Sequence, residues 1–197
     1  MLGDIIFIFI VNMDIIDCIR INNLSQVKNC VENGINIHYR NDEAFRAASS
    51  YGHFKIVKYL LKKGAKIHAN EDGAFRIASY YGHIKIVKYL LKKGANINAR
   101  NGYALIWAVR HANIDIVKLL LKNGVDVSAN NDHALICSVI IGNLELIKLL
   151  LENGADIHVN NDKALRKATI CGKQNIIDFL TNYNPITRIK SAMTNMK

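Results

Sequence analysis

The stretch ASYYGHIKIVKYLLKKGANINAR at residues 78–100 repeats, with few changes, the stretch YGHFKIVKYLLKKGAKIHAN at residues 51–70. The same register extends along the chain, because glycines and leucines return 30 residues apart. These positions are Gly34, Gly64, Gly94, Gly124 and Gly154, and Leu60, Leu90, Leu120, Leu150 and Leu180. A constant period of this length is the signature of a protein built from stacked structural repeats.

Each repeat contains two short apolar stripes. The first runs through Ala74 and Ala78, and the second through Ile86 and Leu90. Both stripes have the spacing of one face of an α-helix. A glycine such as Gly82 separates the two helices, and another follows the second helix, where a left-handed residue commonly ends a helix. Each repeat is therefore predicted to be a helix, a tight turn, a second helix and a loop.

Helices of about ten residues are too short to be stable alone, because nucleation costs more than so few hydrogen bonds return. Stacking of neighbouring repeats would bury the apolar stripes, which predicts an all-α solenoid. Aspartates stand just before the first helix of most repeats, where a carboxylate can accept the unpaired amides of the first turn. We therefore predict that the N-caps are Asp42, Asp72, Asp132 and Asp162, with Gly102 as the exception.

The register also indicates the domain organisation. We predict one repeat domain over residues 1–184, followed by a flexible basic tail. Its parts are a degenerate N-terminal cap at 12–40, four full repeats at 41–160 and a C-terminal cap at 161–184, with the tail at 185–197. The apolar run IIFIFIV at 5–11 is too short to span a bilayer and has no basic region before it. We expect it to pack on the first helices.

The charge and the cysteines narrow the class of protein. The net charge is +10, and the excess of basic residues lies in 41–100 and 161–197. The four cysteines form no CxxC pair, which favours a reduced, intracellular setting in the cytoplasm of the producing or host cell. Cys18, Cys30 and Cys137 fall in helical stretches and are expected to be small core residues.

The sequence has none of the GxGxxG, P-loop, HExxH or GxSxG motifs that mark common catalytic and cofactor sites. We therefore expect no enzyme activity and no cofactor. His38, His68 and His158 share one register position. Stacked helices lie about 8–10 Å apart, whereas zinc holds its nitrogen ligands at about 2 Å, so no metal site is expected there. His53 and His83 follow turn glycines and are expected to make structural hydrogen bonds.

Lysines recur on the second helices of two adjacent repeats. They are Lys55, Lys58 and Lys62 in one repeat and Lys85, Lys88 and Lys92 in the next. Such a stripe is a candidate face for the phosphate groups of nucleic acid or anionic lipid. The alternative, which we favour, is a solvated outer face, since no regular series of exposed aromatic residues accompanies the lysines.

The repeat ALIWAVRHANIDIVKLLLKNGVDVSA at 104–129 resembles the ankyrin repeat, and the resemblance covers residues 12–184. It rests on the Gly-His pairs at 52–53 and 82–83, the Ile-Val pairs, the double leucines and the Gly-Ala pairs. The usual repeat has about 33 residues, and here three are missing between Asn98 and Tyr103, which implies shortened inter-repeat loops. The Thr-Pro-Leu-His segment of the usual repeat is also replaced. Its place is taken by segments that contain Arg46, Arg76 and Arg166.

The shortened repeat, in a chain rich in Ile, Asn and Lys, is similar to the expanded ankyrin families of mimivirus-like giant viruses of amoebae. The resemblance implies that the two residues before each turn glycine face a concave groove. Of these, we expect the partner to contact Tyr51, Tyr80, Tyr81, Arg110, His111, Ile140 and Ile141. The groove rim would consist of Arg40, Asn70, Arg100, Asn130 and Asn160. Packing beneath neighbouring repeats is an equal alternative for the isoleucines, and Trp107 is expected in the core.

Our leading hypothesis is a non-enzymatic scaffold that binds a partner protein, such as a host protein, in its concave groove. The second hypothesis is electrostatic binding of nucleic acid or anionic lipid by the lysines, with affinity that falls as salt rises. A substrate adaptor for ubiquitin ligases is the third hypothesis. Enzyme activity ranks last.

Overall fold

The computed structural model of the protein describes residues 14–183, which form twelve α-helices and no strand. The first helices of the repeats are α2 (Ile15–Arg20), α4 (Tyr39–Ser50), α6 (Ala69–Tyr80), α8 (Ala99–Arg110), α10 (Ala129–Ile141) and α12 (Val159–Ile170). The second helices are α3 (Leu24–Glu32), α5 (Phe54–Lys62), α7 (Ile84–Lys92), α9 (Ile114–Lys122), α11 (Leu144–Glu152) and α13 (Gln174–Asn182). The apolar run at 5–11 and the tail at 185–197 lie outside the described residues.

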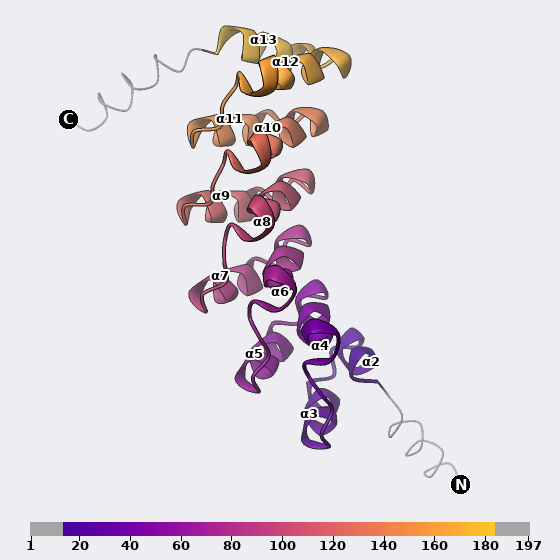
Figure 1. The fold of residues 1–197 in the computed structure, drawn as a ribbon. Coiled ribbons are helices and arrows are strands. Elements are labelled where there is room, and N and C mark those ends of the chain that lie inside the picture. The colour runs from indigo at the N-terminus through magenta and orange to yellow at the C-terminus, as the bar shows by residue number, and fades with distance from the viewer. Residues whose placement is uncertain (1–13, 184–197) are drawn as a thin grey trace, which may run out of the picture. The chain divides into compact units, whose positions relative to one another are not determined.

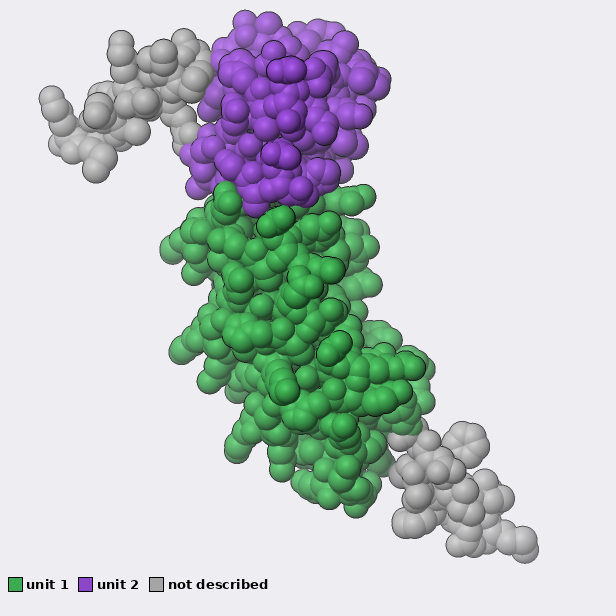
Figure 2. Space-filling model, in the orientation of Figure 1, with its two compact units in different colours: residues 1–126 green, residues 127–197 purple. Residues whose placement is uncertain are grey.

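The chain divides into two compact units, residues 1–126 and residues 127–197, which Figure 2 colours separately. In unit 1, first helices pack on first helices, as α4 on α6 and α6 on α8 (Figure 1). The second helices α5, α7 and α9 likewise contact one another in order. In unit 2, α10 packs on α12 and each of these two helices pairs with its own second helix. The predicted all-α repeat fold is confirmed, while the single-domain bounds stay a prediction.

The core of each repeat consists of the two predicted stripes. In the third repeat of unit 1, α6 buries Ala74, Phe75 and Ala78, and α7 buries Val87 and Leu90. Burial of the larger side chains, Phe75, Val87 and Leu90, stabilises the stack by about 1.5–3 kcal/mol each. Because every repeat offers the same apolar faces to the next, the period in the sequence is the period of the core.

At Gly52 and Gly82 the turn between the two helices of a repeat favours glycine for two reasons, whereas Ala112 has the corresponding position in the next repeat with φ +51°. Gly52 has φ +76°, a conformation that costs other residues backbone strain. A methyl group on Gly52 would also lie 2.6 Å from the His83 ring of the next repeat. Gly82 is packed in the same way against Asn113, whose Oδ1 would lie 3.0 Å from such a methyl group. The turn glycines therefore serve repeat-to-repeat packing as well as the turn itself.

The first helices α4, α6, α8, α10 and α12 each begin with a turn of three successive residues in the left-handed region. In the loop that begins α6 these are Asn70, Glu71 and Asp72, with φ of 52°, 52° and 55°. The regular part of the helix begins after Asp72. No strand hairpin occurs between repeats within residues 14–183, and a compact left-handed turn connects one repeat to the next.

The cysteines lie largely where the sequence predicts. Cys18 and Cys137 are buried, Cys30 is half-buried and Cys171 is exposed, and none of the four forms a disulfide bond. Burial, together with the neighbouring Cys30 thiol, raises the pKa of Cys18 to about 11. At neutral pH the Cys18 thiol is therefore protonated and a poor nucleophile.

Candidate functional site

Aromatic side chains gather where α6 and α8 lie side by side in unit 1. The ring of Tyr80, the last residue of α6, lies 5.4 Å from Trp107 and 3.9 Å from His111 between ring centroids. Tyr81 meets Tyr80 edge-on at 4.7 Å, and Tyr103 meets Trp107 at 5.7 Å. We refer to these five residues as the aromatic cluster.

The aromatic cluster is accessible to a partner. Tyr81 and Tyr103 are 56% and 36% exposed, and His111 is exposed as well. Tyr80 and Trp107 are half-buried, so the expectation that Trp107 is a core residue is only partly met. The cluster joins residues about 30 positions apart in the chain, because successive first helices stack with the same register.

A buried arginine lies beneath the aromatic cluster. Arg76 is 3% exposed, and its guanidinium carbon lies 5.6 Å from the centre of the Trp107 ring. Burial, with Arg100 nearby, lowers the pKa of Arg76. A guanidinium remains protonated in proteins, so Trp107 has a fixed positive charge on one face. The sequence pattern did not indicate this contact.

The remaining predicted groove residues lie at the ends of first helices. In unit 1, Tyr51 is exposed and stacks on His53 with ring centroids 5.8 Å apart, and Arg110 is exposed. In unit 2, Ile140 and Ile141 are 45% and 39% exposed at the end of α10. Their contact with a partner stays a prediction.

The six lysines of the predicted stripe are all exposed on the adjacent helices α5 and α7. Half-buried aromatic rings lie among the lysines of the second helices. Lys28 and Lys63 place their ammonium groups 5.9 and 5.8 Å from the centre of the Tyr59 ring. Lys93 lies in the same way over Tyr89, at 5.8 Å. These tyrosines are half-buried between second helices, which the linear pattern did not reveal.

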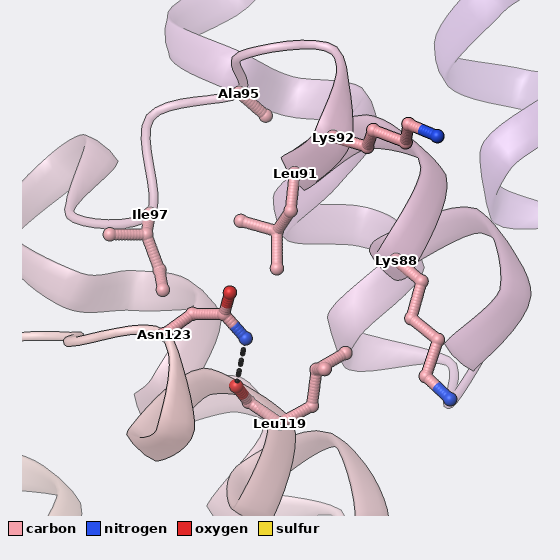
Figure 3. A pocket seen from close by; sticks show the side chains of 7 residues that line it. All are labelled: Lys88, Leu91, Lys92, Ala95, Ile97, Leu119 and Asn123. Carbon is pink, nitrogen blue, oxygen red and sulfur yellow. Dashed lines mark hydrogen bonds between the residues drawn. The ribbon is translucent and has the colours of Figure 1, made fainter.

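A cleft of about 390 Å³ lies between α7 and α9 (Figure 3). Its lining residues are Lys88, Leu91, Lys92, Ala95, Ile97, Leu119 and Asn123. The side chains of Leu91, Ile97 and Leu119 turn toward the central space, and the two lysines extend along one side (Figure 3). The side-chain amide of Asn123, the residue that follows α9, donates to the Leu119 carbonyl of that helix at 2.7 Å. The cleft is therefore apolar inside and cationic at one edge.

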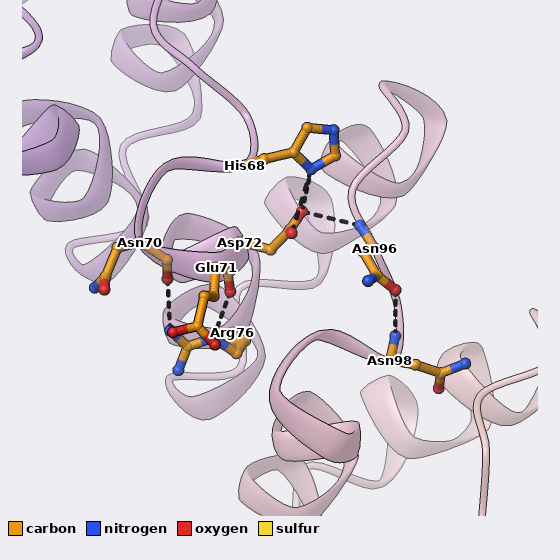
Figure 4. Close-up of polar contacts among 7 residues, drawn as sticks. All are labelled: His68, Asn70, Glu71, Asp72, Arg76, Asn96 and Asn98. Atoms are coloured by element: carbon orange, nitrogen blue, oxygen red, sulfur yellow. Dashed lines mark hydrogen bonds and ion pairs between the residues drawn. The ribbon is translucent and has the colours of Figure 1, made fainter.

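The loop aspartates join neighbouring repeats and do not cap their own helices. Asp72 Oδ1 accepts the backbone amide of Asn96 in the next loop at 2.9 Å (Figure 4). Two other aspartates accept the backbone amide of the residue 24 positions later in the chain. Asp42 Oδ1 accepts the Lys66 amide at 3.0 Å, and Asp132 Oδ1 accepts the Asp156 amide at 2.9 Å. The predicted N-cap role is thus wrong for these aspartates, because the left-handed turn points the carboxylate toward the following repeat.

The repeat that has Gly102 in place of aspartate keeps this connection by another route. Asn98 Oδ1 accepts the backbone amide of Asp126 at 2.9 Å. Asn98 occupies the register position that histidine has in other repeats. Those histidines contact the aspartate of their own loop through Nδ1, in the pairs His38–Asp42, His68–Asp72 and His158–Asp162, at 3.0, 3.1 and 2.6 Å. No group of three metal-ligating side chains occurs within residues 14–183.

The three arginines that replace part of the usual loop motif hold the left-handed turns. Arg76 donates from Nε to the Glu71 carbonyl and from Nη2 to the Asn70 carbonyl, both at 2.8 Å (Figure 4). Arg46 and Arg166 make the corresponding bonds in their own turns. The exposed first residues of the turns, predicted as the groove rim, are Arg40, Asn70, Arg100, Asn130 and Asn160.

The turn histidines have unequal roles. The predicted structural hydrogen bond is confirmed for His83, whose Nε2 lies 2.8 Å from the Ser50 carbonyl oxygen of the preceding repeat. Asn113, at the same register position, donates to the Tyr80 carbonyl at 2.9 Å. The buried Nε2 of His53 has no hydrogen-bond partner among the described residues.

Comparison with protein families agrees with this architecture. A family model described as ankyrin repeats (three copies) matches residues 15–101, 68–131 and 105–191. A comparison with curated proteins found no match. None of the helices in residues 14–183 is both long enough and apolar enough to cross a membrane.

Proposed function

The chain belongs to the ankyrin repeat family, and on this premise we propose that it binds a partner protein through the aromatic cluster of α6 and α8. Ankyrin repeats generally mediate protein–protein interaction, and proteins built from them are typically non-enzymatic scaffolds. The observation that carries the proposal is the group of contacting aromatic rings on adjacent first helices, of which Tyr81, Tyr103 and His111 are exposed.

The physical properties of the aromatic cluster favour binding. Tyrosine and tryptophan supply large contact areas and are enriched among the residues that dominate binding energy. The rings hold one another in place, so little side-chain entropy remains to be lost when a partner binds. The cation of Arg76 beneath Trp107 and the exposed Arg110 favour a partner with acidic groups around an apolar contact.

A host-cell protein is the partner that this proposal names. Its support is the likeness of the shortened repeat to the ankyrin families of giant viruses of amoebae. In unit 1, the exposed Tyr51 that follows α4 is proposed as a further contact residue, and in unit 2 the exposed Ile140 and Ile141 of α10 are proposed as contact residues of their own. Each of these residues is one of the two that precede a turn glycine.

A Tyr80→Ala, Tyr81→Ala double variant is expected to weaken partner binding by about tenfold or more, because tyrosine anchors contribute 2 kcal/mol or more when they are hot spots. The measurement is a tagged pull-down from amoebal lysate with and without nuclease, read by mass spectrometry, followed by titration of the captured protein. Tyr39→Ala is the matched control, since Tyr39 is an exposed tyrosine outside the aromatic cluster. Unchanged affinity in a folded double variant would reject the cluster as the binding site.

The lysines of α5 and α7 support a second candidate function, binding of a polyanion. The specific observation is that six exposed ammonium groups belong to two helices in contact. If a DNA duplex contacted all six, log Kd would change with log salt concentration with a slope of about 5. Titration of duplex DNA and of anionic vesicles at several salt concentrations checks this expectation. Binding that does not depend on salt would exclude it.

A further inference from the structure

Tyrosine rings occupy successive grooves between second helices in unit 1. Tyr59 of α5 projects toward α3, where the Lys28 ammonium lies 5.9 Å from the ring centre. Tyr89 of α7 projects toward α5, where its ring meets Phe54 edge-on at 5.5 Å. Lys58, the counterpart of Lys28, lies over that phenylalanine at 5.7 Å. In both grooves an aromatic ring lies against the preceding second helix, near its lysine.

The groove between α7 and α9 lacks this ring. The register position of Tyr59 and Tyr89 is occupied by Leu119, which is shorter. Asn123 likewise stands where α7 has Lys93. The result is the cleft of about 390 Å³ (Figure 3), a volume within the range of natural ligand pockets.

The lysine at this groove has no ring to contact. Lys88 has the register position of Lys28 and Lys58, and it lines the cleft. Within residues 14–183, neither a ring contact nor an ion pair is found for Lys88. Lys92 lines the same edge. Two cations therefore stand beside an apolar space that in the preceding grooves is filled by an aromatic side chain.

We propose that the cleft between α7 and α9 binds an aromatic side chain of a partner protein, flanked by acidic residues. The aromatic ring would take the place that Tyr59 and Tyr89 take in the preceding grooves, over Leu91, Ile97 and Leu119. Lys88 would lie against the ring face, as Lys28 does. The acidic neighbours of the ring would pair with Lys92 and with other lysines of α7.

The lining favours a phenyl or phenol ring over a nucleobase. Apart from the lysines, it consists of aliphatic side chains and Asn123, one of whose two amide hydrogens is already donated to Leu119. A base would have to bury more polar edge atoms than this lining can pair, which is unfavourable. A phenylalanine ring has no such atoms. The site lies on second helices and is separate from the aromatic cluster on the first helices.

The direct test uses the full chain and a synthetic peptide with one phenylalanine between two pairs of aspartates. Binding is followed by NMR of leucine and isoleucine methyl groups. Shifts are expected at Leu91, Ile97 and Leu119, and a peptide with alanine in place of phenylalanine is expected to bind at least about tenfold more weakly. Absence of shifts at millimolar peptide, or equal binding of the alanine peptide, would overturn the proposal.

Two variants test the geometry. Leu119→Tyr should fill the cleft with the residue that α5 and α7 have at this position, and should reduce peptide binding about tenfold or more. Lys88→Gln changes an exposed side chain and should weaken binding about two- to fivefold, which corresponds to a cation–π contact. Full peptide affinity in both folded variants would place the peptide elsewhere.

Two control variants distinguish binding in the cleft from binding at other lysines or at the aromatic cluster. Lys55→Gln removes an exposed lysine of α5 that does not line the cleft, and is expected to retain peptide binding. The Tyr80→Ala, Tyr81→Ala variant is also expected to bind the peptide normally, so this site can fail or succeed independently of the aromatic cluster. If a single-stranded oligonucleotide shifts the same methyl groups more strongly than the peptide does, the cleft is a nucleic-acid site and the proposal is wrong.

Discussion

Replacing Leu90 with alanine is expected to lower the free energy of unfolding by about 2–5 kcal/mol. Leu90 is fully buried on α7, a helix that contacts both α5 and α9. Removal of its branched side chain forfeits apolar burial and leaves a cavity that the surrounding helices fill only in part. Urea unfolding followed by circular dichroism measures the loss as a lower midpoint at an unchanged slope.

Lys85→Ala is the control for the Leu90 variant, because Lys85 is an exposed residue of the same helix. A surface substitution of this kind is expected to change stability by no more than about 0.5 kcal/mol. If Leu90→Ala unfolded at the same urea concentration as the native protein, the assignment of Leu90 to the core would be refuted.

Replacing Asp72 with alanine is expected to lower the free energy of unfolding by about 1.5–3 kcal/mol. The Asp72 residue is 4% exposed, and its carboxylate accepts the Asn96 amide and contacts His68. Without the carboxylate, the amide of the following repeat loses its partner where solvent has limited access. The stack is thereby weakened at a junction between repeats. Thermal and urea unfolding both report the loss.

Asp72→Asn distinguishes what the hydrogen bond contributes to stability from what the negative charge contributes. The asparagine oxygen can still accept the Asn96 amide, as Asn98 does for Asp126 in the next repeat. The expected loss is therefore smaller than that of Asp72→Ala. Equal stability of the alanine and asparagine variants would show that the bond between repeats contributes nothing measurable.

The predictions that succeeded depend on local periodicity. The glycine register located the turns, and the apolar stripes located the buried side chains such as Phe75 and Leu90. A helix places residues three and four apart on one face whatever its surroundings. For that reason the sequence was sufficient to predict the helix pairs, the core and the repeat fold.

The predictions that failed concern the direction of a side chain. Asp72 stands just before a regular helix, which is the usual place of an N-cap, yet its backbone has positive φ and its carboxylate faces the next loop. A set of three consecutive left-handed residues is not a common helix start. The arginine that holds this turn, Arg76, was visible in the sequence, but its carbonyl partners were not.

The sequence by itself determined the 30-residue period, the all-α repeats and the residues of the core, because these follow from spacing within one or two helical turns. The tertiary structure decided the partners of Asp72 and His83, the contact of Tyr80 with His111, and the open cleft beside Leu119. Each of these features joins residues about 24 to 33 positions apart or lies between two repeats. Their geometry depends on how one repeat stacks on the next, because packing at that junction sets the direction of each side chain and the space left beside it.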